Sequence, residues 1–109
     1  MVKDLDIADV LDDINAIISH GSGVVKRVGV FGSLARGDFS ENSDIDVLIE
    51  YASTPVFNFD RFLQFCELCN RLIENLTNFY GRKVDLVQFE NSPSFTLQND
   101  RVEKEVVWL

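Results

Sequence analysis

The feature that most constrains this fold is the segment GVFGSLARGDFSENSDIDVLIE, residues 29–50, in which two aspartates stand inside an apolar strand. Asp44 and Asp46 alternate with aliphatic residues, so in a β-strand both carboxylates point to the face opposite those apolar side chains. An unpaired carboxylate in a dry core is costly. The two aspartates must therefore be neutralised by a ligand, or lie at an exposed end of the strand.

Composition limits the classes of protein to consider. The chain has 109 residues, so we treat residues 1–109 as a single domain. No apolar run approaches the ~20 residues of a membrane-spanning helix, and the acidic, amphipathic N-terminus MVKDLDIADV is unlike a signal peptide, which favours the cytoplasm. The net charge of −8 argues against direct binding to nucleic acid, because such binding needs clustered Lys and Arg.

Hydrophobic periodicity predicts helices that alternate with strands. Residues 4–19 and 58–80 carry apolar side chains at helical intervals, whereas β-branched, apolar segments predict strands over residues 24–31, 44–51 and 82–89. The C-terminal part is predicted to form a short helix after the second proline, followed by an apolar tail. We therefore expect an α/β (α+β) fold, with a small mixed sheet of three or four strands and helices packed mainly on one face.

The helix expected over residues 58–80 has an unusually wide apolar arc. One stripe is Phe59, Phe62, Cys66, Cys69, Ile73, Leu76 and Tyr80. A second stripe beside it is Phe65, Leu68, Leu72 and Phe79. At ~100° per residue the two stripes span about 200°, so we expect the first to be core and the second to face either helix 4–19 or a partner protein. The two cysteines are interpreted as reduced core thiols, because the chain offers no further ligands at zinc spacing.

The turn at Gly32 and Ser33 is a candidate phosphate site. It follows the first strand and precedes Leu-Ala-Arg, a helical opening that Ser33 is placed to cap. Free backbone N–H groups at such a position favour phosphate. The GSLARGD segment imitates the glycine spacing of a Walker A loop, but Asp38 replaces the required Lys, which excludes a P-loop NTPase. Arg36 either contacts the loop or a phosphate, or pairs at the surface with Asp38 or Glu41.

The aspartates are candidate metal ligands. Residues two apart on a strand are ~6.6 Å apart along the backbone, so Asp44 and Asp46 can bind one divalent ion or bridge two, as in phosphoryl transfer. Oxygen ligands suit Mg²⁺ or Mn²⁺. Asp85, in the apolar segment KVDLVQ, is the candidate third carboxylate, as ligand and general base, or else a simple acid at a strand edge. Nucleotide-sugar glycosyltransferases also contain Asp-x-Asp, but they need a larger nucleotide-binding domain.

GSLARG followed by SDIDVLI strongly resembles the signature of minimal nucleotidyltransferases of the DNA polymerase beta superfamily, and is most similar to MntA-like antitoxins. The resemblance implies the nucleotidyltransferase fold. It also implies that Gly32 and Ser33 hold the β- and γ-phosphates of a nucleoside triphosphate.

For the remaining positions, the resemblance implies that Arg36 steadies the loop or a phosphate. It further implies that Asp44, Asp46 and Asp85 hold two Mg²⁺ ions, or Mn²⁺ in their place, and form the catalytic set.

Members of this size are similar to antitoxins that transfer AMP from ATP to a tyrosine of HEPN-domain ribonuclease toxins. The implied function is a protein adenylyltransferase that pairs with a HEPN-like toxin as a hetero-oligomer, although the residues themselves do not identify ATP among nucleotides. The alternative is a non-catalytic binding module that neutralises its partner by covering it through helix 58–80. The wide apolar arc of that helix and the tail with Trp108 suit a partner surface in either case.

Overall fold

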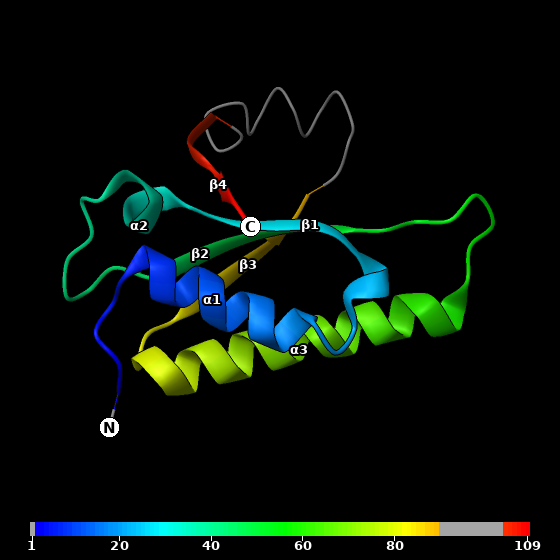
Figure 1. Cartoon of the computed structure of the whole chain (residues 1–109), viewed down its shortest axis with the longest axis horizontal. Helices are drawn as coiled ribbons and strands as arrows, with labels where there is room; N and C mark the ends of the chain where they lie inside the picture. Colours follow the sequence, from blue (N-terminus) through cyan, green and yellow to red (C-terminus); the bar gives the residue numbers. More distant parts are fainter. Residues whose placement is uncertain (1, 90–103) are drawn as a thin grey trace.

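The computed structural model describes residues 2–89 and 104–109 (Figure 1). The elements in chain order are α1 (Ile7–Ile18), the 3₁₀ turn η1 (Ser22–Val24), β1 (Val25–Phe31), α2 (Gly32–Arg36), β2 (Ile45–Tyr51), α3 (Phe59–Tyr80), β3 (Val84–Gln88) and β4 (Val107–Trp108). Within the described residues the strands form one sheet in the order β3-β2-β1-β4. Strand β1 is antiparallel to β2 and β4, whereas β2 and β3 are parallel. The predicted α/β fold with a small mixed sheet is confirmed.

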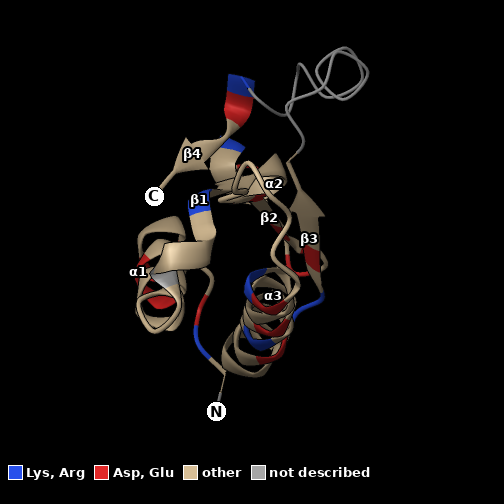
Figure 2. Cartoon of the chain, turned by 90° about the vertical axis from the view of Figure 1, so that its right-hand side faces the viewer, with Lys and Arg blue, Asp and Glu red and all other residues tan. Residues whose placement is uncertain are grey.

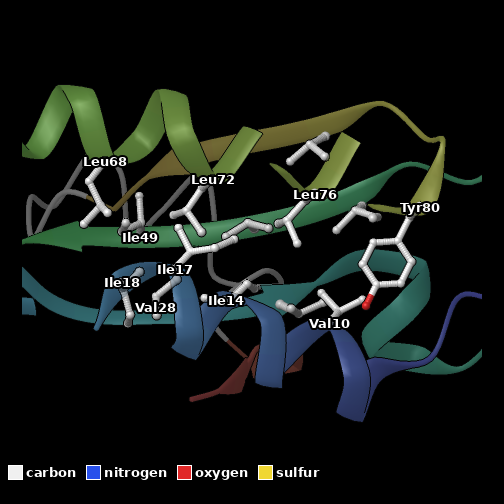
Figure 3. Close-up of a cluster of buried hydrophobic side chains, with 14 of the residues drawn as sticks. Val10, Ile14, Ile17, Ile18, Val28, Ile49, Leu68, Leu72, Leu76 and Tyr80 are labelled. Carbon is white, nitrogen blue, oxygen red and sulfur yellow. The ribbon is translucent and has the colours of Figure 1, made fainter. Parts of the chain in front are cut away.

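Helices α1 and α3 cover one face of the sheet, as both views show (Figures 1 and 2). The hydrophobic core lies between these helices and strands β1 and β2 (Figure 3). Its fully buried members include Val10, Ile14, Val28, Val30, Ile45, Val47, Ile49, Leu72 and Leu76. The aliphatic residues that alternate with the aspartates in β2 therefore point into the core, as the period of two requires.

Side-chain caps set the helix boundaries close to the predicted ones. Helix α1 begins at Ile7, later than predicted, because the Asp6 carboxylate accepts hydrogen bonds from the backbone N–H groups of Ala8 and Asp9. Helix α3 begins after Asn58, whose side chain accepts a hydrogen bond from the Arg61 N–H at 3.1 Å. It ends at Tyr80 and is followed by Gly81, which has a φ of 62°, a left-handed conformation that favours glycine.

The predicted division of α3 into a core stripe and a second stripe is confirmed only in part. Phe65, Leu68 and Leu72 of the second stripe, expected to face helix 4–19 or a partner protein, are buried in the core that α3 shares with α1. The expected core stripe is divided: its C-terminal member Tyr80 is buried, whereas Phe59 is 64% and Ile73 36% exposed. The core face of α3 is thus rotated from the predicted one, because the helix packs against both α1 and the sheet, and this position is a tertiary property.

The sheet face away from α1 and α3 holds a small aromatic and ionic cluster. The Arg27 guanidinium lies 4.2 Å from the centre of the Trp108 ring and 4.5 Å from that of Phe89. Its Nε donates a hydrogen bond to Glu50 at 2.7 Å, and Glu50 is only 8% exposed. Trp108, expected to face a partner, instead packs on the chain's own sheet.

The helix predicted after the second proline lies outside the described residues. Among the residues that are described, every helix is too short or too polar to cross a membrane.

Candidate functional site

The carboxylates predicted to act together are brought to one end of the sheet by strand register. Asp46 pairs with Phe31 of the antiparallel β1 and with Asp85 of the parallel β3. Asp44 lies immediately before β2. Because Asp46 and Asp85 are paired in register on neighbouring strands, which lie ~4.8 Å apart, the two residues are side by side. The predicted third carboxylate is therefore beside the Asp-x-Asp pair.

The Gly-Ser turn lies directly against Asp46. Gly32 has a φ of 73°, and a Cβ built on it would collide with the Asp46 carboxylate. A glycine is required here for both conformation and space. Helix α2 begins at Gly32 itself, with Phe31 as its N-cap residue, so the prediction that Ser33 caps it is wrong. Ser33 lies in the first turn, because the chain turns into the helix one residue earlier than expected.

Asp44 follows a loop that is held by Arg82, a residue far away in the sequence. The Arg82 guanidinium, just beyond α3, donates hydrogen bonds to the backbone oxygens of Ser40 at 2.7 Å and Ser43 at 2.9 Å. The Ser43 hydroxyl in turn accepts a hydrogen bond from the Ser40 N–H at 2.8 Å. Sequence reasoning missed Arg82, because nothing in the local pattern shows that the end of α3 reaches this loop.

The electrostatic surroundings of Asp46 favour a bound cation. Burial raises the pKa of the Asp46 carboxyl above its usual value, and the negative charges of Asp85 and Asp44 raise this pKa further. Arg36 opposes the shift, and Glu105 adds to it more weakly. The charges around Asp46 are therefore predominantly negative, and a divalent cation would relieve their repulsion.

The donor set suits Mg²⁺, although the side chains do not form a closed cage. No three His, Cys, Asp or Glu side chains within residues 2–89 and 104–109 converge tightly enough to hold a metal ion. The Asp85 carboxylate is turned toward Lys83, whose ammonium lies 3.5 Å from it. Mg²⁺ usually binds one or two carboxylates, with waters and substrate phosphates completing its shell. Asp46 with Asp44 or Asp85 meets that need without a complete protein cage.

Arg36 joins the site through a residue that sequence reasoning missed. Its Nη1 donates to the Glu105 carboxylate at 3.0 Å, and its Nε donates to Asp38 at 3.2 Å. The second oxygen of Glu105 accepts a hydrogen bond from the Gly32 N–H at 3.3 Å. The predicted surface pair with Asp38 is confirmed, but Glu105 is the more buried partner, with 16% of its side chain exposed. Glu105 is 69 residues from Arg36, so no local motif could have indicated it.

Comparison with other proteins gives a family match over most of the chain. The model of a family described as "Nucleotidyltransferase domain" matches residues 11–109. A protein of Methanocaldococcus jannaschii, inferred to be a protein adenylyltransferase, is 41% identical over 63 residues, which are 58% of this chain and 56% of that relative. The chain thus spans little more than half the length of this relative. The protein adenylyltransferase MntA of Thermococcus cleftensis is 35% identical over 85 residues, 78% of this chain and 75% of MntA.

Solved structures show the same fold. A protein inferred to be a minimal nucleotidyltransferase superposes with a TM-score of 0.60 at 27% identity, covering 96% of this chain and 97% of that one. A chain from a toxin-antitoxin crystal structure with AMP-PNP also superposes with a TM-score of 0.60, at 23% identity, over 89% of this chain and 69% of its own length. With a family model matched from residue 11 to the C-terminal residue and a glycine turn packed on paired carboxylates, the chain belongs to the nucleotidyltransferase domain family.

Proposed function

We propose that this protein transfers AMP from ATP to a hydroxyl group of a partner protein. The observation that carries the proposal is the contact of the Gly32 turn with the Asp46 carboxylate, with Asp85 opposite Asp46 in the next strand. This arrangement puts backbone N–H donors for phosphate next to carboxylates suited to Mg²⁺. Phosphoryl-type transfer needs both, because its transition state spreads negative charge over the phosphate oxygens.

The triphosphate would be held by Gly32, Ser33 and Arg36. The Gly32 N–H and the Arg36 guanidinium already converge on one carboxylate, that of Glu105, which is evidence that they can bind an anion together. The Ser33 hydroxyl, half-buried in the first turn of α2, supplies a further donor at this loop.

Asp44, Asp46 and Asp85 are the residues that would hold two Mg²⁺ ions, with Mn²⁺ as a possible substitute. When bound, these ions stabilise the developing charge on the phosphates and the leaving pyrophosphate. The acceptor oxygen forms a bond to the α-phosphorus while the bond to the pyrophosphate oxygen breaks. The acceptor proton passes to a carboxylate, and Asp85, 43% exposed at its side chain, is the candidate base.

The acceptor we propose is a tyrosine of a HEPN-type toxin, which makes this chain the antitoxin of the pair. Two similarities support a protein acceptor: the relative MntA is named a protein adenylyltransferase, and a structural neighbour is a toxin-antitoxin chain crystallised with AMP-PNP. An exposed apolar patch on this chain provides a surface for such a partner. It consists of Val56, Phe57, Phe59 and Leu63, which are 81%, 68%, 64% and 45% exposed.

The test is label transfer from α-labelled ATP with Mg²⁺, with and without a co-purified partner protein. Label on the partner that is lost in the Asp44→Asn/Asp46→Asn double variant supports the proposal, and peptide mapping identifies the acceptor residue. Label that persists in the double variant would contradict the roles given to these carboxylates. Circular dichroism of the double variant confirms that any loss is not unfolding.

The exposed apolar patch also favours a second candidate function, a binding module that neutralises its partner by occlusion. The buried positions of α3 cannot serve this function, since Leu68 is only 2% exposed. The discriminating variant is therefore Phe57→Glu/Phe59→Glu, which changes exposed side chains at the start of α3. Occlusion alone predicts a stable complex with no label transfer from any nucleotide, and loss of that complex in this variant.

A further inference from the structure

The C-terminal segment places one carboxylate on the donors assigned above to phosphate. Glu105 Oε1 accepts a hydrogen bond from the Gly32 N–H at 3.3 Å, and Oε2 accepts one from Arg36 Nη1 at 3.0 Å. Each oxygen uses a different donor, so the carboxylate spans the gap between backbone amide and guanidinium. Two oxygens of a phosphate group would use the same donors in the same way. The anion at this position is supplied by the protein itself.

The segment that carries Glu105 is anchored to the sheet. Strand β4 pairs Val107 with Val30 and Trp108 with Gly29, and the Leu109 N–H donates to the Val28 oxygen at 2.8 Å. The Arg27 guanidinium stacks on the Trp108 ring, 4.2 Å from its centre. These contacts fix the backbone only a few residues beyond Glu105.

Gly29 makes this close approach possible. A Cβ at Gly29 would lie 2.7 Å from the Val107 oxygen and 2.8 Å from a methyl group of Val106. Any larger residue at position 29 would push the C-terminal segment away from the sheet. The strand that leads into the Gly32 turn is therefore shaped to accept the segment that brings Glu105 to that turn.

We propose that Glu105 is an autoinhibitory residue that occupies the triphosphate position and must leave Gly32 and Arg36 before a nucleotide binds there. The inference rests on the proposed function, because it takes these two groups as phosphate donors. Glu105 thus competes with a triphosphate for the same donors. Residues 104–109, which we call the C-terminal strap, hold it in place. A carboxylate that only braced Arg36 for catalysis would have the opposite effect on nucleotide affinity, which makes the two roles separable.

The test compares the dissociation constant of AMP-PNP with Mg²⁺, by calorimetry, in the wild type and in Glu105→Gln. Glutamine keeps the size of the side chain and loses its charge, so we expect binding about tenfold tighter than in the wild type. The matched control is Asp38→Asn, because Asp38 also pairs with Arg36, at 3.2 Å, without contacting Gly32. We expect the control to change the dissociation constant by less than about twofold, as for a solvent-exposed pair.

A second variant acts on the C-terminal strap and leaves Glu105 in place. Trp108→Ala removes the ring that stacks on Arg27, and we expect it to tighten AMP-PNP binding in the same direction. Circular dichroism and a thermal melt establish that each variant is folded.

Unchanged or weaker binding in folded Glu105→Gln, or an equal gain in Asp38→Asn, would overturn autoinhibition while leaving the proposed function intact. If neither the wild type nor Glu105→Gln binds AMP-PNP at millimolar concentration, the triphosphate site itself is refuted, and the inference falls with it.

Discussion

Gly32 and Asp46 are in direct contact, with only the hydrogen of the glycine fitting between the turn and the carboxylate. Gly32→Ala adds a methyl group at this contact and also forces alanine into a positive φ of 73°. We expect the variant to lose about 2 kcal/mol of unfolding free energy, from backbone strain plus the displaced carboxylate. Nucleotide transfer should fall by at least about a hundredfold, because the Asp46 carboxylate must move. Urea denaturation and label transfer measure the two effects.

Gly37→Ala is the matched control for this prediction. Gly37 also has a positive φ, 82°, but a Cβ there would meet no atom within 4 Å. We expect a similar strain cost of roughly 1 kcal/mol with most of the transfer activity retained. Equal losses of activity in the two glycine variants would show that the contact with Asp46 is not the reason that Gly32 is needed.

Asp46 is expected to reduce stability at neutral pH when no divalent cation is present. Burial and the charges of Asp85 and Asp44 raise its pKa in the folded state. As the pH rises, the unfolded chain loses this proton first. The folded state is therefore progressively destabilised between the unfolded-state pKa and the folded-state pKa of Asp46, and this contribution reaches its full size above the folded-state pKa. Asp46→Asn should therefore raise the Tm by about 2–4 °C near pH 7.5 in EDTA, and change it little near pH 3.

Mg²⁺ supplies the internal check on that prediction. The ion should raise the Tm of the wild type by binding the folded state, and should raise the Tm of Asp46→Asn much less. A wild-type Tm that equals that of Asp46→Asn near pH 7.5 in EDTA would show that the carboxylate repulsion costs no stability.

The secondary structure and much of the candidate site could be predicted because their signals are local. The alternation in DIDVLIE fixes which side chains of β2 face the core, and Gly81 marks the end of α3. Asp44 and Asp46 are close in sequence, and Asp85 follows from its apolar strand. Each of these signals lies within its own element or next to it in the sequence.

The features that sequence reasoning missed depend on contacts between distant segments. The rotation of α3 depends on simultaneous packing against α1 and the sheet, so a helix with a ~200° apolar arc leaves its core face undetermined. Glu105 reaches Gly32 because β4 adds to β1. Two residues of β4 carry no periodic signal, and a glutamate in the charged run EKE before an apolar tail looks like ordinary surface charge.

Tyr80 links the C-terminal end of α3 to α1 through a partly buried hydrogen bond. Its hydroxyl donates to the Asp13 carboxylate at 2.6 Å. Burial, followed by this hydrogen bond and then by the charge of Asp13, raises the pKa of Tyr80 well above its usual value. Tyr80→Phe should cost about 1–2 kcal/mol in urea denaturation, because the carboxylate loses a donor. Tyr51→Phe is the control, since the Tyr51 ring packs on Phe62 and Phe65 and its hydroxyl has no hydrogen-bond partner among the described residues. Equal losses in the two variants would contradict a specific role for the bond.

The Cys69 thiol should ionise only at a higher pH than an exposed thiol. Cys69 and Cys66 line a pocket of about 250 Å³ between α3 and strands β2 and β3. Burial, with a smaller contribution from the charge of Cys66, raises the pKa of Cys69 to about 11. Only the thiolate reacts with iodoacetamide, so its alkylation rate should rise about tenfold per pH unit from pH ~7 to ~10 without a plateau. Fragment-ion mass spectrometry separates the two cysteines, and a plateau near pH ~8.5, the behaviour of an exposed thiol, would contradict the prediction.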